Sequence, residues 1–454
     1  MTTDKLYDIY LQHPVISTDT RRIAPGSMFF ALKGDKFDAN TFAQQAIQAG
    51  AAYAVIDDAK YRLGEQYILV EDVLGALQDL ARYHRKQLDI PVIGLTGTNG
   101  KTTTKELINA VLSQRYITQA TQGNLNNHIG VPLTILTIDE SHEAAVIEMG
   151  ANHQMEIDFL CSIAWPTHGL ITNVGKAHLE GFGGVEGVKK AKGELYDYLA
   201  NLPSAAGTLQ EERDDFEKPD GVAFINSDDN TLLQMAGARS LQRVVYYGTQ
   251  SANNLVTGRL IENSPQLVLA WQQKDSADTY FVKSQLTGVY NLDNILAAIA
   301  IGIYLGLSPE QVNQGIEGYQ PKNNRSQIVQ TATNTLICDY YNANPSSMLV
   351  AIDNLDKITA DRKVLILGDM FELGDESPAE HLAVIAKAFE ANVDERIFIG
   401  KDFLDQSSAF SGSGKFYQTA EEAIVALQNE PIRNSTILIK GSRGMALERL
   451  VELF

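Results

Sequence analysis

The sequence has few of the residues that mark secreted or membrane proteins. Only 2 of its 454 residues are cysteines, Cys161 and Cys338, which stand far apart in apolar surroundings. They match neither a disulfide framework nor a metal site, so we expect buried free thiols in a reducing compartment. No apolar run reaches the roughly 18 residues of a membrane span. The N-terminus lacks the basic and apolar segments of a secretion signal. A cytoplasmic protein is therefore expected.

Positive charge is also scarce. Lys and Arg number 37 against 56 Asp and Glu, so the formal net charge is −19. A nucleic-acid-binding protein needs a basic face, and this balance argues against that class. The hydrophobic content of 44% and the charged content of 20% are typical of globular proteins. The length of 454 residues exceeds what one hydrophobic core organises, so several domains are expected.

Alternating strand and helix patterns divide the chain into three α/β units, residues 1–90, 91–318 and 319–454. In the middle unit the alternation predicts a doubly wound, largely parallel sheet. Residues 255–288 then carry strand patterns without helices and predict a small antiparallel sheet. The polar, acidic stretch 203–220 is typical of a surface loop.

A glycine-rich stretch, GLTGTNGKTTTKE at 94–106, lies between an apolar strand pattern and a helical pattern. Backbone N–H groups of such a turn surround phosphate oxygens, and the helix that follows adds its positive end. Lys101 supplies a charge for the outer phosphates and Thr102 a hydroxyl for Mg²⁺. Leu95 stands where the strict phosphate-loop pattern has glycine, so this is a variant loop. The expected nucleotide contacts here are Gly97, Thr98, Asn99, Gly100, Lys101, Thr102 and Thr103. The alternative is a flexible strand–helix connection.

Two further candidates follow apolar strand patterns in the middle unit. Glu148 ends the strand pattern AAVIE, at the edge where α/β proteins bind ligands, and a carboxylate there can hold Mg²⁺. His178 follows the strand pattern of 168–175. A single histidine is more often structural, and a solvated acid is the alternative for Glu148.

Lys192 occupies an unusual position in the helical pattern of 184–200. It stands four residues after Val188 and three before Leu195, so it lies on or beside the buried stripe. A buried lysine must pair, shift its pKa or be modified. The alternative is a lysine that extends its amine from the helix edge into water.

Polar residues of the later loops suit a ribose, a base and a phosphate. Asn294 begins a helical pattern, Arg325 stands in NNRSQ, and Asp339 and Asn342 follow the strand pattern TLIC. Isolated loops of this composition are usually only turns.

Taken in chain order, these motifs resemble one family. They are TGTNGKT, IEMGAN, TNVGKAHLEGFG, AKGE, GVYNLDN, NNRSQ and DYYNANP. Together they resemble the Mur ligases, the ATP-dependent amide ligases of peptidoglycan precursor synthesis. Four further stretches, at 17–40, 123–136, 339–348 and 367–377, indicate the member that joins D-alanyl-D-alanine to UDP-N-acetylmuramoyl-tripeptide. One departure is His128, where the resemblance predicts an acid.

The resemblance implies a three-domain α/β fold in which a central, doubly wound P-loop-type ATPase domain is flanked by two smaller α/β domains. Residues 1–90 would hold the UDP substrate, 91–318 would hold ATP, and 319–454 would close over ATP and bind the incoming amine. UDP-substrate contacts are expected from Ser17, Thr18, Asp19, Arg21 and Lys33. Mg²⁺ would be held by Thr102, Glu148, His178 and Lys192, the last carrying a carbamate. Lys101, Lys192 and His178 would be the catalytic residues.

The resemblance also implies ATP and Mg²⁺ as cofactors, with Asn294, Arg325, Asp339 and Asn342 as nucleotide contacts. The reaction would pass through an acyl phosphate and release ADP and phosphate, and a monomer is expected. Two alternatives stay open. One is a Mur-type ligase for another amine, such as diaminopimelate or lysine, or a folylpolyglutamate-type relative. The other is a nucleotide-binding regulator without ligase activity.

Overall fold

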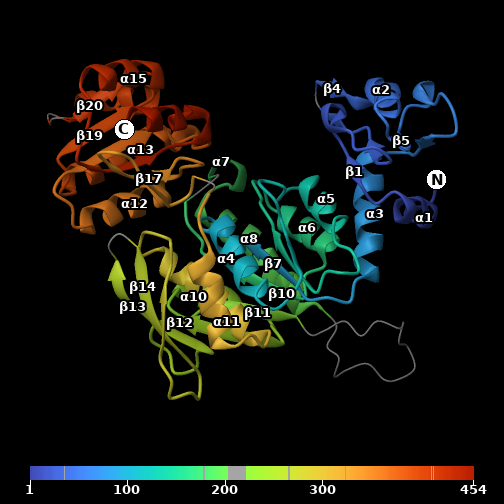
Figure 1. Ribbon diagram of the computed structural model, residues 1–454, viewed down its shortest axis with the longest axis horizontal. Coiled ribbons are helices and arrows are strands. Elements are labelled where there is room, and N and C mark those ends of the chain that lie inside the picture. Colours follow the sequence, from blue (N-terminus) through green and yellow to red (C-terminus); the bar gives the residue numbers. More distant parts are fainter. Residues whose placement is uncertain are drawn as a thin grey trace.

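The computed structural model describes residues 1–34, 36–176, 179–202, 221–263, 266–322, 324–410, 412 and 414–454. Its strands form three main sheets, one in each predicted unit, with helices packed around them (Figure 1). This confirms the α/β class. The predicted loop 203–220 and the candidate His178 lie outside the described residues. In the part of the chain described here, no helix is both long and apolar enough to cross a membrane.

The first sheet has four parallel strands in the order β1-β2-β5-β6. They are β1 (Ile16–Ser17), β2 (Met28–Phe30), β5 (Tyr53–Ile56) and β6 (Tyr67–Leu69). A two-stranded ribbon, β3 (Lys33–Gly34) and β4 (Phe37–Asp38), pairs beside it, and helix α2 (Ala43–Gln48) packs against β5. Asp72 caps helix α3 (Val73–Gln87), since its carboxylate accepts hydrogen bonds from the backbone N–H groups of Leu74 and Gly75.

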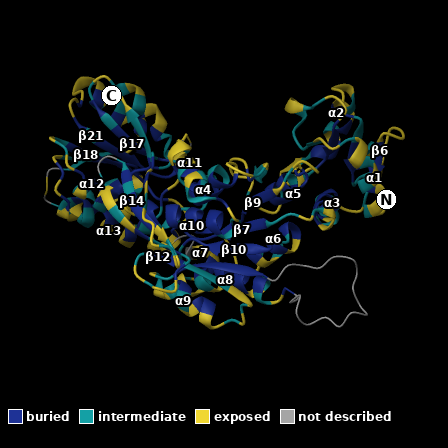
Figure 2. Ribbon diagram, turned by 60° about the horizontal axis from the view of Figure 1, so that its bottom comes forward, coloured by how far each residue is buried: buried dark blue, intermediate teal, exposed yellow. Residues whose placement is uncertain are grey.

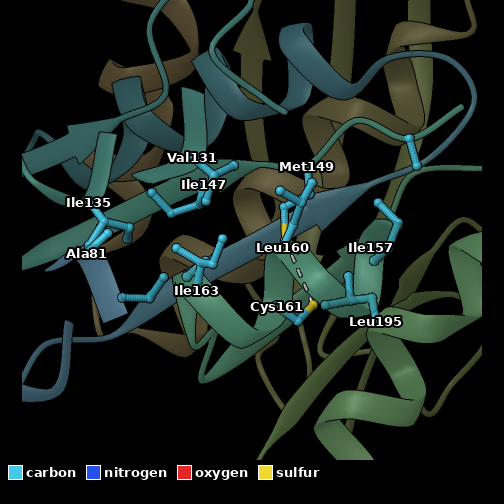
Figure 3. Packing of buried hydrophobic residues seen from close by; sticks show 14 of the residues in the cluster. Ala81, Val131, Ile135, Ile147, Met149, Ile157, Leu160, Cys161, Ile163 and Leu195 are labelled. Atoms are coloured by element: carbon cyan, nitrogen blue, oxygen red, sulfur yellow. Dashed lines mark hydrogen bonds between the residues drawn. The ribbon is translucent and has the colours of Figure 1, made fainter. Parts of the chain in front are cut away.

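Helix α3 joins the first unit to the central one. It packs on α1 (Thr3–Gln12) on one side and on α5 (Gly130–Ile135) and α6 (Glu156–Ala164) on the other. Ala81 of α3 belongs to the same buried cluster as Ile135 of α5 and Ile163 of α6 (Figure 3). The side-chain hydroxyl of Tyr10 in α1 adds a hydrogen bond of 2.7 Å to the carbonyl of Leu136. Each such buried aliphatic side chain stabilises the junction by about 1.5–3 kcal/mol.

The central sheet has nine strands in the order β15-β14-β13-β12-β11-β10-β7-β9-β8. The parallel strands are β7 (Val92–Thr96), β8 (Thr118–Ala120), β9 (Ala144–Glu148), β10 (His168–Ile171), β11 (Val222–Asn226) and β12 (Arg243–Gly248). Strand β7 lies between β9 and β10, so the chain order reverses on either side of it. Ligands of open α/β sheets bind beyond the carboxyl end of such a strand.

Side chains of β7 alternate between the two faces, as a doubly covered sheet requires. Ile93 and Leu95 face a core shared with α4 (Lys101–Leu112), α10 (Asn291–Tyr304) and α11 (Pro309–Gly318). Val92 faces the core of α6 and α8 (Val185–Ala200). The prediction of a doubly wound sheet is therefore confirmed.

The antiparallel strands of residues 255–288 correct one prediction. They are β13 (Val256–Asn263), β14 (Leu267–Gln273) and β15 (Tyr280–Lys283), and they pair antiparallel as expected. They do not form a sheet of their own, however, because β13 pairs with β12 through Val256 and Thr257 and so extends the central sheet. The strand pattern predicted that these strands are antiparallel, but it carried no information about the pairing of β13 with the edge of the central sheet.

The third sheet has six strands in the order β16-β17-β21-β18-β19-β20, of which only β16 is antiparallel. They are β16 (Gln327–Gln330), β17 (Thr335–Asp339), β18 (Lys363–Gly368), β19 (Glu395–Ile399), β20 (Gly414–Tyr417) and β21 (Thr436–Lys440). Helices α12 (Pro345–Lys357), α13 (Ser377–Glu390) and α15 (Ala420–Asn429) cover it. The first and third units rise on opposite sides of the central one, whose strands β7, β9, β10 and β11 are buried (Figure 2).

Both cysteines are free and buried, as predicted. The thiol of Cys161 lies 3.8 Å from the sulfur of Met149 inside the core between β9 and α6 (Figure 3). Burial raises the pKa of the Cys338 thiol to about 11. Neither thiol is therefore a nucleophile at neutral pH.

Candidate active site

The glycine-rich loop connects the carboxyl end of β7 to the first turn of α4. Gly97 and Gly100 both have positive φ, at +147° and +80°. A Cβ on Gly97 would clash with the side chain of Thr172, and one on Gly100 would come within 2.7 Å of the amide oxygen of Asn294. Glycine is therefore required at both positions, and the loop presents its N–H groups at the helix N-terminus, a site that favours anions.

A cavity of about 390 Å³ opens in front of this loop. Its walls come from two units of the chain, the central one and the third. The lining residues from the central unit are Thr98–Thr103, Asn173–Gly175, Tyr290, Asn291 and Asn294. Those from the third unit are Arg325, Ser326, Asp339, Asn342, Asn344, Ser346, Ser347, Val350 and Lys440. The cavity therefore exists only where the two units meet.

Lys101 turns its amine back onto the loop. The Nζ atom donates hydrogen bonds of 2.7 Å to the carbonyl of Gly97 and 3.0 Å to the carbonyl of Thr98. Desolvation lowers the pKa of Lys101, and the charge of Glu148 acts in the opposite direction. A phosphate oxygen would be a stronger partner for this amine than two neutral carbonyls, since hydrogen bonds between ions are stronger.

Thr102 and Glu148 meet at the carboxyl ends of β7 and β9. The Thr102 hydroxyl donates to Glu148 Oε2 at 2.8 Å, and the amide of Asn126 donates to Oε1 at 2.9 Å. The Glu148 side chain is almost fully buried, at 2% exposure. A buried carboxylate beside a hydroxyl is an oxygen pair of the kind that Mg²⁺ prefers.

Lys192 lies on the buried stripe of α8, as predicted, with 2% of the residue exposed. No described residue accepts a hydrogen bond from its amine, which lies 5.2 Å from the centre of the Phe182 ring. Burial, and next the charge of Lys101, lower the pKa of Lys192 to about 7. The alternative of a lysine extended into water is therefore wrong, and burial favours the neutral form of the amine.

The described residues contain no cluster of three or more His, Cys, Asp or Glu side chains that could hold a metal ion. The predicted metal ligand His178 lies outside them. Thr102 and Glu148 are thus the two predicted metal ligands whose side chains contact each other.

The four residues predicted from the later loops all line the cavity. Asn294 accepts a hydrogen bond of 2.9 Å from the hydroxyl of Thr104, which ties helix α10 to helix α4. The guanidinium of Arg325 lies 3.8 Å from the centre of the Tyr341 ring. Asp339 pairs with Lys440 at 2.7 Å, and Asn342 stands beside this pair, its carbonyl 3.5 Å from the Lys440 amine.

The five residues predicted in the first unit lie away from this cavity, and none of them lines it. Ser17 ends β1, Thr18 follows it, and Asp19 caps the next turn. The Asp19 carboxylate also pairs with Arg21 at 2.7 Å, and this pairing lowers the pKa of Asp19 to about 2. Lys33 in β3 pairs with Asp57 at 2.7 Å, and nearly half of its side chain is exposed.

Comparison with known protein families gives matches in all three units of the chain. Residues 14–85 match the Mur ligase family catalytic domain, residues 95–302 the Mur ligase middle domain, and residues 324–443 the glutamate ligase domain of Mur ligases. The UDP-N-acetylmuramoyl-tripeptide–D-alanyl-D-alanine ligase of Bacillus subtilis is 35% identical over 96% of this chain and 92% of its own length. The chain belongs to the Mur ligase family.

Other relatives of this Mur ligase agree. The UDP-N-acetylmuramoyl-tripeptide–D-alanyl-D-alanine ligase of Escherichia coli is 36% identical, over 96% of this chain and 92% of its own length. A crystal structure of MurF from Acinetobacter baumannii superimposes with a TM-score of 0.84 at 30% identity, over 99% of this chain and 98% of that one. The similarity to these relatives therefore covers all three sheets.

The structure also places residues in this Mur ligase site that the motifs did not single out. Lys440 is buried at the end of β21, and its sequence signal is a lysine directly after the apolar run TILI. Asn126 donates a hydrogen bond to Glu148, and Asp57 forms an ion pair with Lys33. Asn344 and Ser346, within the stretch 339–348, form hydrogen bonds with the side chain of Asn99. None of these pairings is readable from sequence spacing.

Proposed function

We propose that this Mur ligase joins D-alanyl-D-alanine to UDP-N-acetylmuramoyl-tripeptide at the expense of ATP, in peptidoglycan precursor synthesis. The observation that carries the proposal is the phosphate loop itself. Lys101 and the buried Thr102–Glu148 pair stand at the mouth of a cavity that the third unit completes. The curated relatives of the same length carry the name of this activity.

The loop would hold the ATP phosphates. Gly97, Thr98, Asn99, Gly100 and Thr103 are the proposed loop contacts, with the N–H groups of Thr98 and Asn99 held by Asn173. Lys101 would exchange its two carbonyl partners for phosphate oxygens. Thr102 and Glu148 suit Mg²⁺, because a hydroxyl and a buried carboxylate already lie 2.8 Å apart there. A bound Mg²⁺ offsets the negative charge that gathers between the phosphate and the substrate carboxylate.

Lys192 fits a carbamate. A neutral, buried amine with no described hydrogen-bond acceptor can add CO₂, which turns a cation that is costly to bury into an anion. That anion would be a further ligand for Mg²⁺, together with His178. The residue thereby acts as a metal ligand in its modified form.

The third unit would close the nucleotide site. Asn294, Arg325, Asp339 and Asn342 line the cavity opposite the phosphate loop and offer amide, guanidinium and carboxylate groups to a base and a ribose. We further propose that residues 91–318 are the ATPase domain and that residues 319–454 close over ATP and bind the incoming amine.

The first unit, residues 1–90, would hold the UDP end of the substrate. Ser17, Thr18, Asp19, Arg21 and Lys33 are the proposed contacts, and the exposed cations Arg21 and Lys33 suit a pyrophosphate. We propose a monomer, because the described cavity is completed within one chain. We also propose that the protein is cytoplasmic.

The reaction follows from charge. A carboxylate is a poor electrophile, so the γ-phosphate of ATP is transferred to the terminal carboxylate of the tripeptide. The resulting acyl phosphate is attacked by the amine of D-alanyl-D-alanine, an amide bond forms, and phosphate leaves. Lys101 stabilises the charge of the transferred phosphate. Because water would hydrolyse the acyl phosphate, the two units must exclude it while the intermediate exists.

The product tests the proposal. The protein is incubated with ATP, Mg²⁺, UDP-N-acetylmuramoyl-tripeptide and one amine, and the product is weighed by mass spectrometry. The proposal predicts the pentapeptide product with the dipeptide amine alone. Ligation of diaminopimelate or lysine to a shorter peptide would contradict this step of the pathway, and ATP binding without any ligation would favour the regulator.

A further inference from the structure

Asn99, in the middle of the phosphate loop, divides its hydrogen bonds between two units of the chain. Its backbone forms hydrogen bonds with residues of the central unit. The N–H donates to Asn173 Oδ1 at 3.0 Å, and the carbonyl accepts from the Thr172 hydroxyl at 2.6 Å and from Asn173 Nδ2 at 3.0 Å. The backbone of Asn99 is therefore fixed to the end of β10.

The side chain of Asn99 forms its hydrogen bonds with residues of the third unit. Its Nδ2 donates to the hydroxyl of Ser346 at 2.9 Å, and its Oδ1 accepts from Nδ2 of Asn344 at 2.8 Å. These partners are 247 and 245 residues away in sequence. We call this group of three side chains the loop–cap contact. It turns the amide of Asn99 toward the third unit, at a wall of the cavity that all three residues line.

The partner side of the contact is a rigid helix start. Asn344 is the N-cap of α12, where its Oδ1 accepts from the backbone N–H of Ser347 at 2.9 Å and from the Ser346 hydroxyl at 2.9 Å. Pro345 follows at the first helical position. Met348, Ile352 and Leu355 of the same helix are fully buried in the core of the third unit. A displacement of the cap is therefore transmitted to the whole unit.

The loop side of the contact changes its bonding when a phosphate binds. The carbonyls of Gly97 and Thr98, just before Asn99, accept the hydrogen bonds of Lys101. A nucleotide phosphate that takes the Lys101 amine releases both carbonyls. The peptide groups of Gly97 and Thr98 then lose one restraint, while the Asn99 backbone keeps its bonds to Thr172 and Asn173. A change in the loop would reach Asn344 and Ser346 through the Asn99 side chain.

We propose that Asn99 is a positioning residue that couples nucleotide occupancy of the phosphate loop to the orientation of the third unit, through the loop–cap contact. This inference rests on the proposed function only in that the cavity takes a nucleotide. Asn99 thereby acts on the reaction indirectly, by placing the third-unit walls of the cavity over the phosphates.

A double-mutant cycle tests the coupling. Asn99→Ala removes both hydrogen bonds of the contact, and Ser346→Ala removes the bonds of its hydroxyl to Asn99 and Asn344. In both variants Asn344 can still accept from the backbone N–H of Ser347 and cap α12. We expect kcat to fall about tenfold in Asn99→Ala while the Kd for ADP changes less than about threefold. The double variant should lose no more than about twofold beyond Asn99→Ala, because both changes break the same contact. Independent, multiplying losses would overturn the inference, as would a loss of ADP affinity equal to the loss of kcat.

Lys176 offers a matched control. It pairs with Glu380 of α13 at 2.7 Å and also joins the central unit to the third, but it does not touch the phosphate loop. Lys176→Ala should keep kcat within about threefold, since the pair lies outside the phosphate loop, although the buried Glu380 carboxylate loses its partner. A loss as large as that of Asn99→Ala would mean that any weakening of this junction has the same effect, and would contradict a special role for Asn99.

Hydrogen exchange of the whole chain gives a readout that needs no turnover. With ADP and Mg²⁺ as the probe, the first-turn amides of α12 should gain protection in the unaltered protein and in Lys176→Ala, but not in Asn99→Ala. Equal gains in all three proteins would overturn the coupling. Protection of α12 without any ligation would contradict the proposed function and support the coupling through Asn99. Ligation without protection of α12 would support the proposed function and contradict the coupling.

Discussion

Thr102, in the first turn of α4, donates a hydrogen bond of 2.8 Å to the buried carboxylate of Glu148 at the end of β9. The two residues are 46 positions apart in sequence and meet because β7 and β9 are parallel neighbours that end at the same edge. Their oxygens thus lie together beside the phosphate loop before any ligand binds.

Glu148→Gln should raise the Mg²⁺ concentration for half-maximal activity at least about tenfold. The amide keeps an acceptor for Thr102 but loses the charge that a hard cation prefers. Titrating Mg²⁺ at saturating ATP measures the change. The control is Glu140→Gln, an exposed acid near the start of the same strand, which should leave the Mg²⁺ requirement unaltered. An unchanged requirement in Glu148→Gln would remove this residue from the metal site.

Lys101→Ala should abolish turnover, with a loss of at least about a thousandfold, because its charge stabilises the transferred phosphate. Binding of the UDP substrate, measured by calorimetry, should remain within about threefold, since the proposed contacts lie in the first unit. If UDP-substrate binding were lost as well, the division of the two sites between units would be wrong.

Lys33→Ala should show the opposite pattern. We expect the KM for the UDP substrate to rise about tenfold with little change in kcat, as for a group that contributes equally to ground-state and transition-state binding. Lys60→Ala is the control, because Lys60 also pairs with an aspartate, Asp58, on the surface of the same unit. Equal effects of the two changes would indicate a general charge effect instead of a binding contact.

Lys192→Ala should abolish ligation, and short carboxylic acids should restore part of it by supplying the missing anion. The exposed-side neighbour Lys189, which pairs with Glu186, gives the control Lys189→Ala. Full activity of Lys192→Ala in steady-state assays would refute the carbamate.

The pKa of about 7 for Lys192 adds a pH dependence. CO₂ adds only to the neutral amine, which is the dominant form above this pKa and falls to roughly a tenth at pH 6. Preincubation with bicarbonate at pH 8 should therefore load the residue faster than at pH 6. The measurement is activity after rapid transfer to one assay pH, and equal recovery from both preincubations would contradict the assignment.

Much of the site could be predicted because its residues follow buried strands. Glu148 comes directly after the apolar run AAVI, and Thr102 follows the glycine-rich loop after another strand. Because parallel strands end at one edge, both were predicted as parts of one site. The helical spacing to Val188 and Leu195 placed Lys192 on or beside the buried stripe but left open a lysine extended into water. The resemblance of the motifs to Mur ligases then supplied the roles that spacing alone left open.

Other features depend on packing between units and could not be read from the chain. The pairing of β13 with β12 and the contact of Asn99 with Ser346 join surfaces whose partners no local pattern specifies. Strand β20, with its run of half-buried residues, has neither a clear alternation nor a long apolar stretch. Such elements are fixed by tertiary contacts, which outweigh local propensity.

The central claim is that ATP is consumed to activate a carboxylate for one particular amine. The most direct measurement is phosphate release by the purified protein from ATP and Mg²⁺, with UDP-N-acetylmuramoyl-tripeptide present throughout. The amine is D-alanyl-D-alanine, a single amino acid, or absent. The account predicts sustained release with the dipeptide alone and a Lys101→Ala variant at background. Equal release under all three conditions, or none despite bound ATP, would contradict it.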